Sequence, residues 1–145
     1  MKTVILCGGK GTRLIEKTEL IPKPLVEIGG KPVLWHLMKI YSKFGYNKFV
    51  LCLGYKGEKI IDYFRENPEK WDIEFADTGL ETQTGGRIKK IEKFIKEDNF
   101  FCTYADGLSD LNIKSLCEFH LKKNKTATIT AVNPLSQFGI LDLNS

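Results

Sequence analysis

Short apolar runs alternate along the chain with segments in which apolar residues recur every three or four positions. Runs typical of strands occur at 3–6, 25–28, 49–53, 71–76, 100–104 and 127–132. Helical spacing marks the segments 32–44, 57–67, 88–95 and 112–123. Regular alternation of strands and helices is typical of a parallel sheet with helical crossovers. The pattern therefore predicts an α/β fold with a Rossmann-like, doubly wound, mostly parallel sheet and helices on both of its faces.

The residues that bound these segments support the prediction. Pro32 stands where a helix would begin and Gly45 where it would end. The run 49–53 is wholly apolar, as in a parallel strand buried on both faces. Residues 77–87 are rich in threonine and glycine and are predicted to form a loop before the next helix. A last apolar segment at 138–143 is typical of the start of another strand.

Length and composition indicate one globular domain over residues 1–145. The sequence is 42% hydrophobic and 28% charged, which excludes disordered and fibrous classes. The net charge of +4 is not gathered into a long basic block, so we expect no nucleic-acid partner. Apolar runs are too short for a membrane span or a signal-peptide core, which predicts a soluble, cytoplasmic protein.

The four cysteines, Cys7, Cys52, Cys102 and Cys117, form no Cys-x-x-Cys pair. Three of them end apolar runs that are predicted to be strands. We therefore expect buried, reduced thiols rather than a zinc site or a disulfide framework.

A glycine-rich turn follows the first predicted strand and contains Gly8, Gly9 and Gly11. Because glycine has no Cβ, such a turn can approach a polyphosphate closely and direct backbone N–H groups toward it. The spacing matches neither the P-loop nor the dinucleotide fingerprint. A purely steric role for the glycines in a strand-to-helix turn remains the alternative.

Basic side chains accompany this turn at Lys10, Arg13 and Lys23, where they could neutralise phosphate charge. Pro22 and Pro24 restrict the backbone on both sides of Lys23. The turn with its cations therefore predicts a phosphate-binding site.

Further motifs accompany the opening Leu-x-Gly-Gly-x-Gly-Thr-Arg-Leu and Pro-Lys-Pro. They are Gly29-Gly30-Lys31-Pro32, residues 35–41, Gly54-Tyr55-Lys56-Gly57, Asp77-Thr78-Gly79, Thr84-Gly85-Gly86-Arg87 and Tyr104-Ala105-Asp106-Gly107. In this order, over nearly the whole chain, they resemble the sugar-1-phosphate nucleotidyltransferases. Within that family they are most similar to the cytidylyltransferases that act on glucose 1-phosphate.

The resemblance implies transfer of a nucleotidyl group from CTP to glucose 1-phosphate, giving CDP-glucose and pyrophosphate for lipopolysaccharide O-antigen synthesis. The sugar phosphate oxygen would attack the α-phosphorus in line. The protein then has to position two anions and stabilise developing charge, without supplying a nucleophile of its own.

Individual roles are implied by the same resemblance. Arg13 would hold the β- and γ-phosphates and Lys23 would stabilise the α-phosphoryl transition state, which makes them the candidate catalytic residues. Asp106, at a strand end, would bind Mg²⁺, the implied cofactor. The implied nucleotide-binding set is Leu6, Gly8, Gly9, Gly11, Thr12, Arg13, Lys23, Thr82, Thr84, Gly85, Arg87, Asp106 and Gly107.

The residues alone leave simpler alternatives open. Arg13 could form a surface ion pair with Glu16, and Lys23 could be a solvated loop lysine. The Asp106-Gly107 pair could only form a turn. The segment 82–87 could be an ordinary Gly-Gly turn with Arg87 in the first turn of the next helix.

Members of the family continue well beyond this length, with strands that carry the sugar pocket and a second metal-binding aspartate. The chain therefore resembles their N-terminal nucleotide-binding part, either as a fragment or as a natural truncation. Uridylyl or thymidylyl transfer, and nucleotide binding without catalysis, stay open as alternatives. A sheet edge left uncovered after residue 143 would favour self-association, so a homo-oligomer is expected.

Overall fold

The computed structural model describes residues 1–9 and 21–132. Lys10, Gly11, Thr12 and Arg13, and the strand expected at 138–143, lie outside the described residues. The chain divides into two units, Met1–Leu111 and Asn112–Ser145, which are described separately.

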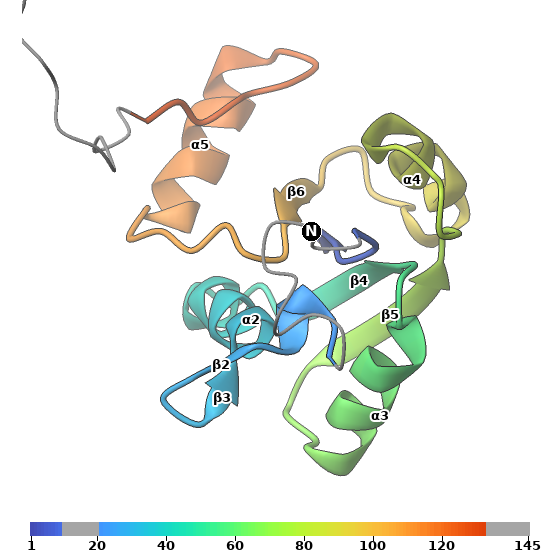
Figure 1. Cartoon of the computed structure of the whole chain (residues 1–145). Helices are drawn as coiled ribbons and strands as arrows, with labels where there is room; N and C mark the ends of the chain where they lie inside the picture. Colours follow the sequence, from blue (N-terminus) through green and yellow to red (C-terminus); the bar gives the residue numbers. More distant parts are fainter. Residues whose placement is uncertain (10–20, 133–145) are drawn as a thin grey trace, which may run out of the picture. The chain divides into compact units, whose positions relative to one another are not determined.

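A parallel four-stranded sheet forms the centre of the first unit (Figure 1). Its strands are β1 (Thr3–Leu6), β4 (Lys48–Leu53), β5 (Asp72–Asp77) and β6 (Phe101–Tyr104), in the order β5-β4-β1-β6. All three pairings are parallel, which confirms the predicted sheet. The chain moves outward from β1 to β4 and β5 and then returns to the opposite side of β1. Such a reversal creates a crevice at the carboxyl ends of β1 and β6, where open α/β sheets bind their ligands.

Helices cover both faces of this sheet. One face carries α4 (Thr84–Lys90) and the 3-10 turn η3 (Glu92–Phe94), whose apolar residues pack on Val4 and Val50. Figure 1 shows α2 (Val33–Lys43) and α3 (Gly57–Glu66) on the other side of β4 and β5. There the ring of Phe49 lies 5.7 Å from that of Trp71. Successive residues of these strands therefore pack their side chains against helices on opposite faces of the sheet.

The helix boundaries on the α2 and α3 side follow from local sequence. Pro32 precedes the first residue of α2, and Gly45 adopts φ +84° just after its end, as is usual at a helix C-terminus. The predicted strand at 25–28 is only partly present. Residues Lys23–Leu25 form the 3-10 turn η2, and β2 (Glu27–Ile28) pairs antiparallel with β3 (Lys31–Pro32) through the Gly29-Gly30 turn.

The segment 77–95 differs from the prediction. Helix α4 begins at Thr84, so Thr84, Gly85 and Arg87 are helical rather than part of a loop. Its backbone hydrogen bonds start with the Arg87 N–H, which donates to the Gln83 carbonyl at 3.0 Å. The Arg87 side chain is buried in the protein. Its tertiary contacts stabilise the start of this helix, although two glycines precede Arg87 and glycine disfavours helix.

Two predicted strands also need correction. Strand β6 is at the sheet edge, so Cys102 and Tyr104 are exposed although a buried strand was expected. No strand forms at 127–132, where Ile129 is 88% exposed. None of the described strands pairs with this segment, so it has no ladder hydrogen bonds that would make it a strand.

The second unit contains α5 (Ile113–Lys123), which confirms the helix predicted at 112–123. The Asn112 side chain caps it by accepting a hydrogen bond from the Ser115 N–H at 3.0 Å. Leu121, on this helix, is exposed. None of the helices within 1–9 and 21–132 is long and apolar enough to cross a membrane.

None of the four cysteines forms a disulfide, and Cys7, Cys52 and Cys117 are buried as expected, whereas Cys102 is exposed. Burial raises the pKa of the Cys52 thiol from 9.0 to about 12, and it also raises the pKa of Cys7. The unfolded chain therefore ionises these two thiols at lower pH than the folded chain does.

This difference predicts a loss of stability at alkaline pH. The contribution of each thiol is fully present below pH 9 and is lost as pH rises from 9 toward the folded pKa. Between pH 8 and about 10, each thiol should remove about 1.4 kcal/mol from the free energy of unfolding. Urea unfolding across this range should show the decline, and Cys52→Ala should reduce its slope. An unchanged slope in that variant would contradict the assignment.

Candidate functional site

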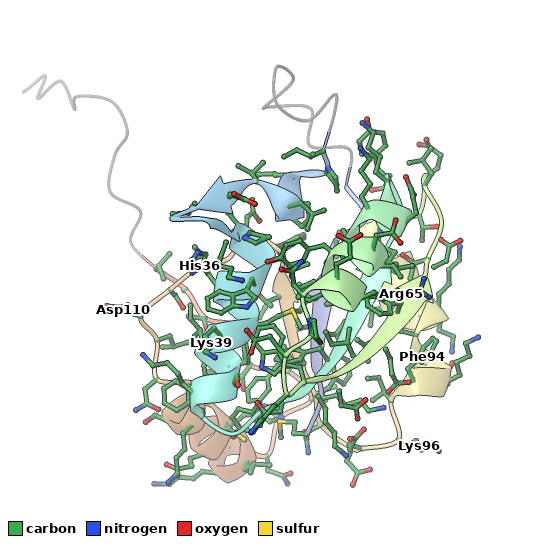
Figure 2. All side chains as sticks on the ribbon, turned by 90° about the horizontal axis from the view of Figure 1, so that it is seen from below. His36, Lys39, Arg65, Phe94, Lys96 and Asp110 are labelled. Atoms are coloured by element: carbon green, nitrogen blue, oxygen red, sulfur yellow. The ribbon has the colours of Figure 1, made fainter. Side chains whose placement is uncertain are left out.

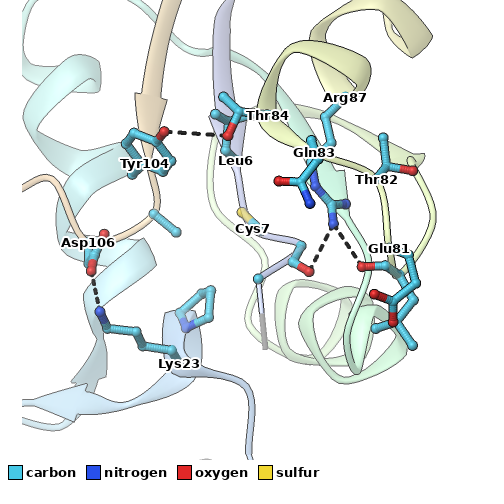
Figure 3. A pocket seen from close by; sticks show the side chains of 15 residues that line it. Leu6, Cys7, Lys23, Glu81, Thr82, Gln83, Thr84, Arg87, Tyr104 and Asp106 are labelled. Atoms are coloured by element: carbon cyan, nitrogen blue, oxygen red, sulfur yellow. Dashed lines mark hydrogen bonds and ion pairs between the residues drawn. The ribbon is translucent and has the colours of Figure 1, made fainter. Parts of the chain in front are cut away.

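A cavity of about 670 Å³ lies at the carboxyl ends of β1 and β6, where the sheet topology predicts a ligand site (Figure 3). Its walls come from the glycine turn after β1, the 3-10 turn η2, the loop after β5, the start of α4 and the end of β6. The lining residues are Leu6, Cys7, Gly8, Gly9, Lys23, Pro24, Leu80, Glu81, Thr82, Gln83, Thr84, Arg87, Tyr104, Ala105 and Asp106.

Lys23 and Asp106 meet in this wall, although 83 positions separate them in the sequence. The Lys23 Nζ lies 2.5 Å from Asp106 Oδ2, and both side chains remain partly exposed, at 37% and 45%. Figure 3 shows the pair reaching toward each other from η2 and from the end of β6. The structure therefore brings together the candidate catalytic cation and the candidate metal ligand.

The cavity offers few acidic ligands for a metal ion, so a metal bound there would need further ligands from a bound phosphate. No group of three or more His, Cys, Asp or Glu side chains gathers around a common point in residues 1–9 and 21–132. Asp106 thus offers one carboxylate. Mg²⁺ is commonly held by one or two carboxylates together with waters and phosphate oxygens, so the donor set suits it only with a phosphate ligand present.

The loop after β5 is held in place by two hydroxyls and a lysine. Thr78 donates both its N–H and its hydroxyl to the Leu53 carbonyl, at 3.0 and 2.6 Å. The Lys90 ammonium of α4 donates to the Thr78 carbonyl and to the Thr82 hydroxyl, both at 3.0 Å. These bonds fix the wall of the cavity that carries Thr82.

Arg87 occupies the buried end of the same wall and is only 6% exposed. Its Nη1 donates to the Leu53 carbonyl at 3.0 Å and to the Thr78 hydroxyl at 2.6 Å. Its Nη2 donates to the carbonyls of Gly8 at 3.1 Å and Leu80 at 3.2 Å. The guanidinium therefore joins the glycine turn, the end of β4 and the loop after β5.

Glycine is required where these segments meet. A Cβ on Gly8 would lie 2.0 Å from Arg87 Nη1, closer than any real contact. A Cβ on Gly54 would lie 2.8 Å from the Gly8 carbonyl oxygen. Both positions lack room because the Arg87 side chain and the glycine turn are packed against each other.

Most of the described residues of the predicted nucleotide set line the cavity. They are Leu6, Gly8, Gly9, Lys23, Thr82, Thr84, Arg87 and Asp106. Gly85 and Gly107 are close in sequence to lining residues but are not part of the wall.

Tyr104 and Gln83 also line the cavity, although the sequence pattern alone does not mark them as site residues. The Tyr104 hydroxyl lies 3.5 Å from the Thr84 hydroxyl and is exposed with the rest of its side chain. Its position at the end of a strand, directly before Ala105-Asp106, was the signal that could have marked it.

Comparison of the sequence with known proteins identifies the family of this chain. A family model described as nucleotidyl transferase matches residues 2–145. The chain belongs to the nucleotidyl transferase family. A probable glucose-1-phosphate cytidylyltransferase of Bacillus subtilis is 47% identical over 97% of this chain and 64% of that protein. The glucose-1-phosphate cytidylyltransferase of Salmonella typhimurium is 44% identical over all of this chain and 65% of that protein.

The crystal structure of HddC from Yersinia pseudotuberculosis, complexed with GMP-PN, superposes with a TM-score of 0.73 at 36% identity. The superposition covers 83% of this chain and 54% of the HddC chain. The chain thus spans less than two thirds of the length of these family members. The alignment with the Salmonella protein extends over 168 positions, more than the 145 residues of this chain, so that relative has additional residues within the matched region.

Proposed function

We propose that the residues of this cavity catalyse the transfer of a nucleotidyl group from a nucleoside triphosphate to a sugar 1-phosphate, with release of pyrophosphate. The observation that carries the proposal is the Lys23–Asp106 pair beside the glycine turn, in one cavity wall. A fixed ammonium stabilises charge that develops on phosphate oxygens. An adjacent carboxylate can hold a divalent ion that bridges the same phosphates.

The proposed substrate pair is CTP and glucose 1-phosphate. It rests on the names of the Bacillus and Salmonella relatives, at 47% and 44% identity. Mg²⁺ is the proposed metal, with Asp106 as its protein ligand, and it would supply positive charge to the phosphate oxygens. Lys23 would contribute a second positive charge from η2 without depending on the metal.

Calorimetric titration of the 145-residue chain with CTP, UTP, dTTP and ATP, each with Mg²⁺, tests the proposal. We expect CTP to bind at least about tenfold more tightly than the other nucleotides, a difference of about 1.4 kcal/mol. Asp106→Asn should lower the affinity in Mg²⁺, because it removes one metal ligand and little volume. In EDTA it should not lower the affinity, because the lost carboxylate is a negative charge that pairs with Lys23. Asp62→Asn, at an exposed position on α3, is the matched control.

The results of these titrations test base preference, catalysis and nucleotide binding separately. Preference for UTP or dTTP would contradict the cytidylyl assignment and support the related transferases. Binding of CTP without pyrophosphate release, on addition of glucose 1-phosphate, would indicate a nucleotide-binding module. No nucleotide binding by a chain with the expected circular dichroism would contradict the proposed function as a whole.

A further inference from the structure

Arg87 is a buried cation whose two Nη atoms donate to protein oxygens. Its four hydrogen bonds go to the carbonyls of Leu53, Leu80 and Gly8 and to the Thr78 hydroxyl. No carboxylate within the described residues forms an ion pair with it. A guanidinium is costly to bury unless its N–H groups are hydrogen-bonded, and these four acceptors offset that cost.

The bond from Arg87 to the Gly8 carbonyl constrains the next peptide group. The Gly8 oxygen accepts from Arg87 Nη2 at 3.1 Å and from the Tyr55 N–H at 3.4 Å. The described residues contain no cis peptide bond, and in a trans peptide the C=O and the following N–H point in opposite directions. The Gly9 N–H is therefore directed away from Arg87 and Tyr55.

Gly9 is exposed and lines the cavity. Its N–H has no hydrogen-bond partner within residues 1–9 and 21–132, and a Cβ built on Gly9 would meet none of their atoms within 4 Å. An amide in open space beside a cavity is available to a ligand oxygen.

We infer that Arg87 is a positioning residue, which fixes the Gly8–Gly9 peptide so that the Gly9 N–H is presented to a bound nucleotide. This inference rests on the proposed function for the identity of the ligand. Arg87 acts through the backbone, so its effect on binding is independent of the base. A direct contact between an Nη atom of Arg87 and the base or ribose would require that atom to give up a bond to a protein acceptor.

Arg87→Lys tests the inference, because lysine keeps the charge but cannot donate to four separated acceptors. Arg65→Lys is the matched control, since Arg65 is exposed on the last turn of α3 (Figure 2). Two quantities are measured for both variants. The first is the amide ¹H–¹⁵N spectrum of the free protein, and the second is the affinity for CTP, UTP and dTTP with Mg²⁺.

In Arg87→Lys we expect the Gly9 amide resonance to shift and all three affinities to fall about tenfold or more, by the same factor. Arg65→Lys should change neither. An unshifted Gly9 amide would overturn the inference. A change in the ratio of CTP to UTP affinity would also overturn it, in favour of direct contact with the base.

The inference can still be tested if Arg87→Lys does not fold, or if the wild-type chain binds no nucleotide. If Arg87→Lys does not fold, Thr78→Val removes a single acceptor of Arg87 and should shift the same Gly9 amide, and no shift there overturns the inference. If the wild-type chain binds no nucleotide, the proposed function fails, whereas the amide spectra still decide whether Arg87 holds the Gly8–Gly9 peptide.

Discussion

Gly8→Ala is expected to lower the free energy of unfolding by about 3 kcal/mol and to abolish most nucleotide binding. The new Cβ would lie 2.0 Å from Arg87 Nη1 and 2.3 Å from its Cζ. Overpacking costs roughly 1–3 kcal/mol, and displacing the guanidinium leaves a buried charge short of its acceptors. Urea unfolding followed by the fluorescence of Trp35 and Trp71 measures the change.

Gly9→Ala is the matched control for stability, because a Cβ on Gly9 meets nothing within 4 Å and Gly9 does not require a positive φ. It should alter the free energy of unfolding by less than about 1 kcal/mol. Adding Arg87→Ala to Gly8→Ala should remove the clash. If Gly8→Ala is equally damaging with and without the Arg87 side chain, the contact between them is not the cause.

Lys23→Ala should have the opposite profile, with a large functional loss and a small loss of stability. The Lys23–Asp106 pair is partly exposed, and surface ion pairs contribute about 0–1 kcal/mol. Removal of a preorganised charge that faces a phosphoryl transition state typically costs about 10²–10³ in rate. We therefore expect pyrophosphate release to fall by about two orders of magnitude, and unfolding to be nearly unchanged.

Lys89→Ala is a suitable control for this prediction. Lys89 forms an ion pair of 2.6 Å with Glu92 on the surface, and neither residue lines the cavity. The control should retain both turnover and CTP affinity. A Lys23→Ala protein that matches Lys89→Ala in both measurements would exclude Lys23 from the site.

The parallel sheet could be predicted because its strands are continuous apolar runs or alternate regularly, and the carboxyl ends of parallel strands share one edge. Asp106 was placed at that edge from its position after β6, and the structure confirms this. The strand expected at 127–132 was wrong. Its apolar residues satisfy the same local pattern, but a strand also needs a neighbour, which a local pattern does not specify.

The hydrogen-bond partners of the Arg87 side chain could not be predicted from the sequence. The family resemblance implied that Arg87 contacts the nucleotide, and the alternative placed it in the first turn of the next helix. It lies in the first turn of α4, with its guanidinium bonded to four protein oxygens. Those acceptors come from three segments, and two of the oxygens belong to residues 79 and 34 positions away. Three of the four acceptors are backbone carbonyls, which every residue type has, so residue types in the sequence do not reveal them.

By itself the sequence determined the order along the chain of the four strands of the parallel sheet and of the helices between them, and it marked Gly8, Gly9, Lys23 and Asp106 as candidate site residues. These depend on local periodicity and on residue types that a short segment reveals. The tertiary structure alone decided that Lys23 meets Asp106 and that Arg87 excludes any side chain at Gly8. Such contacts depend on how distant segments pack, and packing is set by volume and hydrogen-bond geometry in three dimensions.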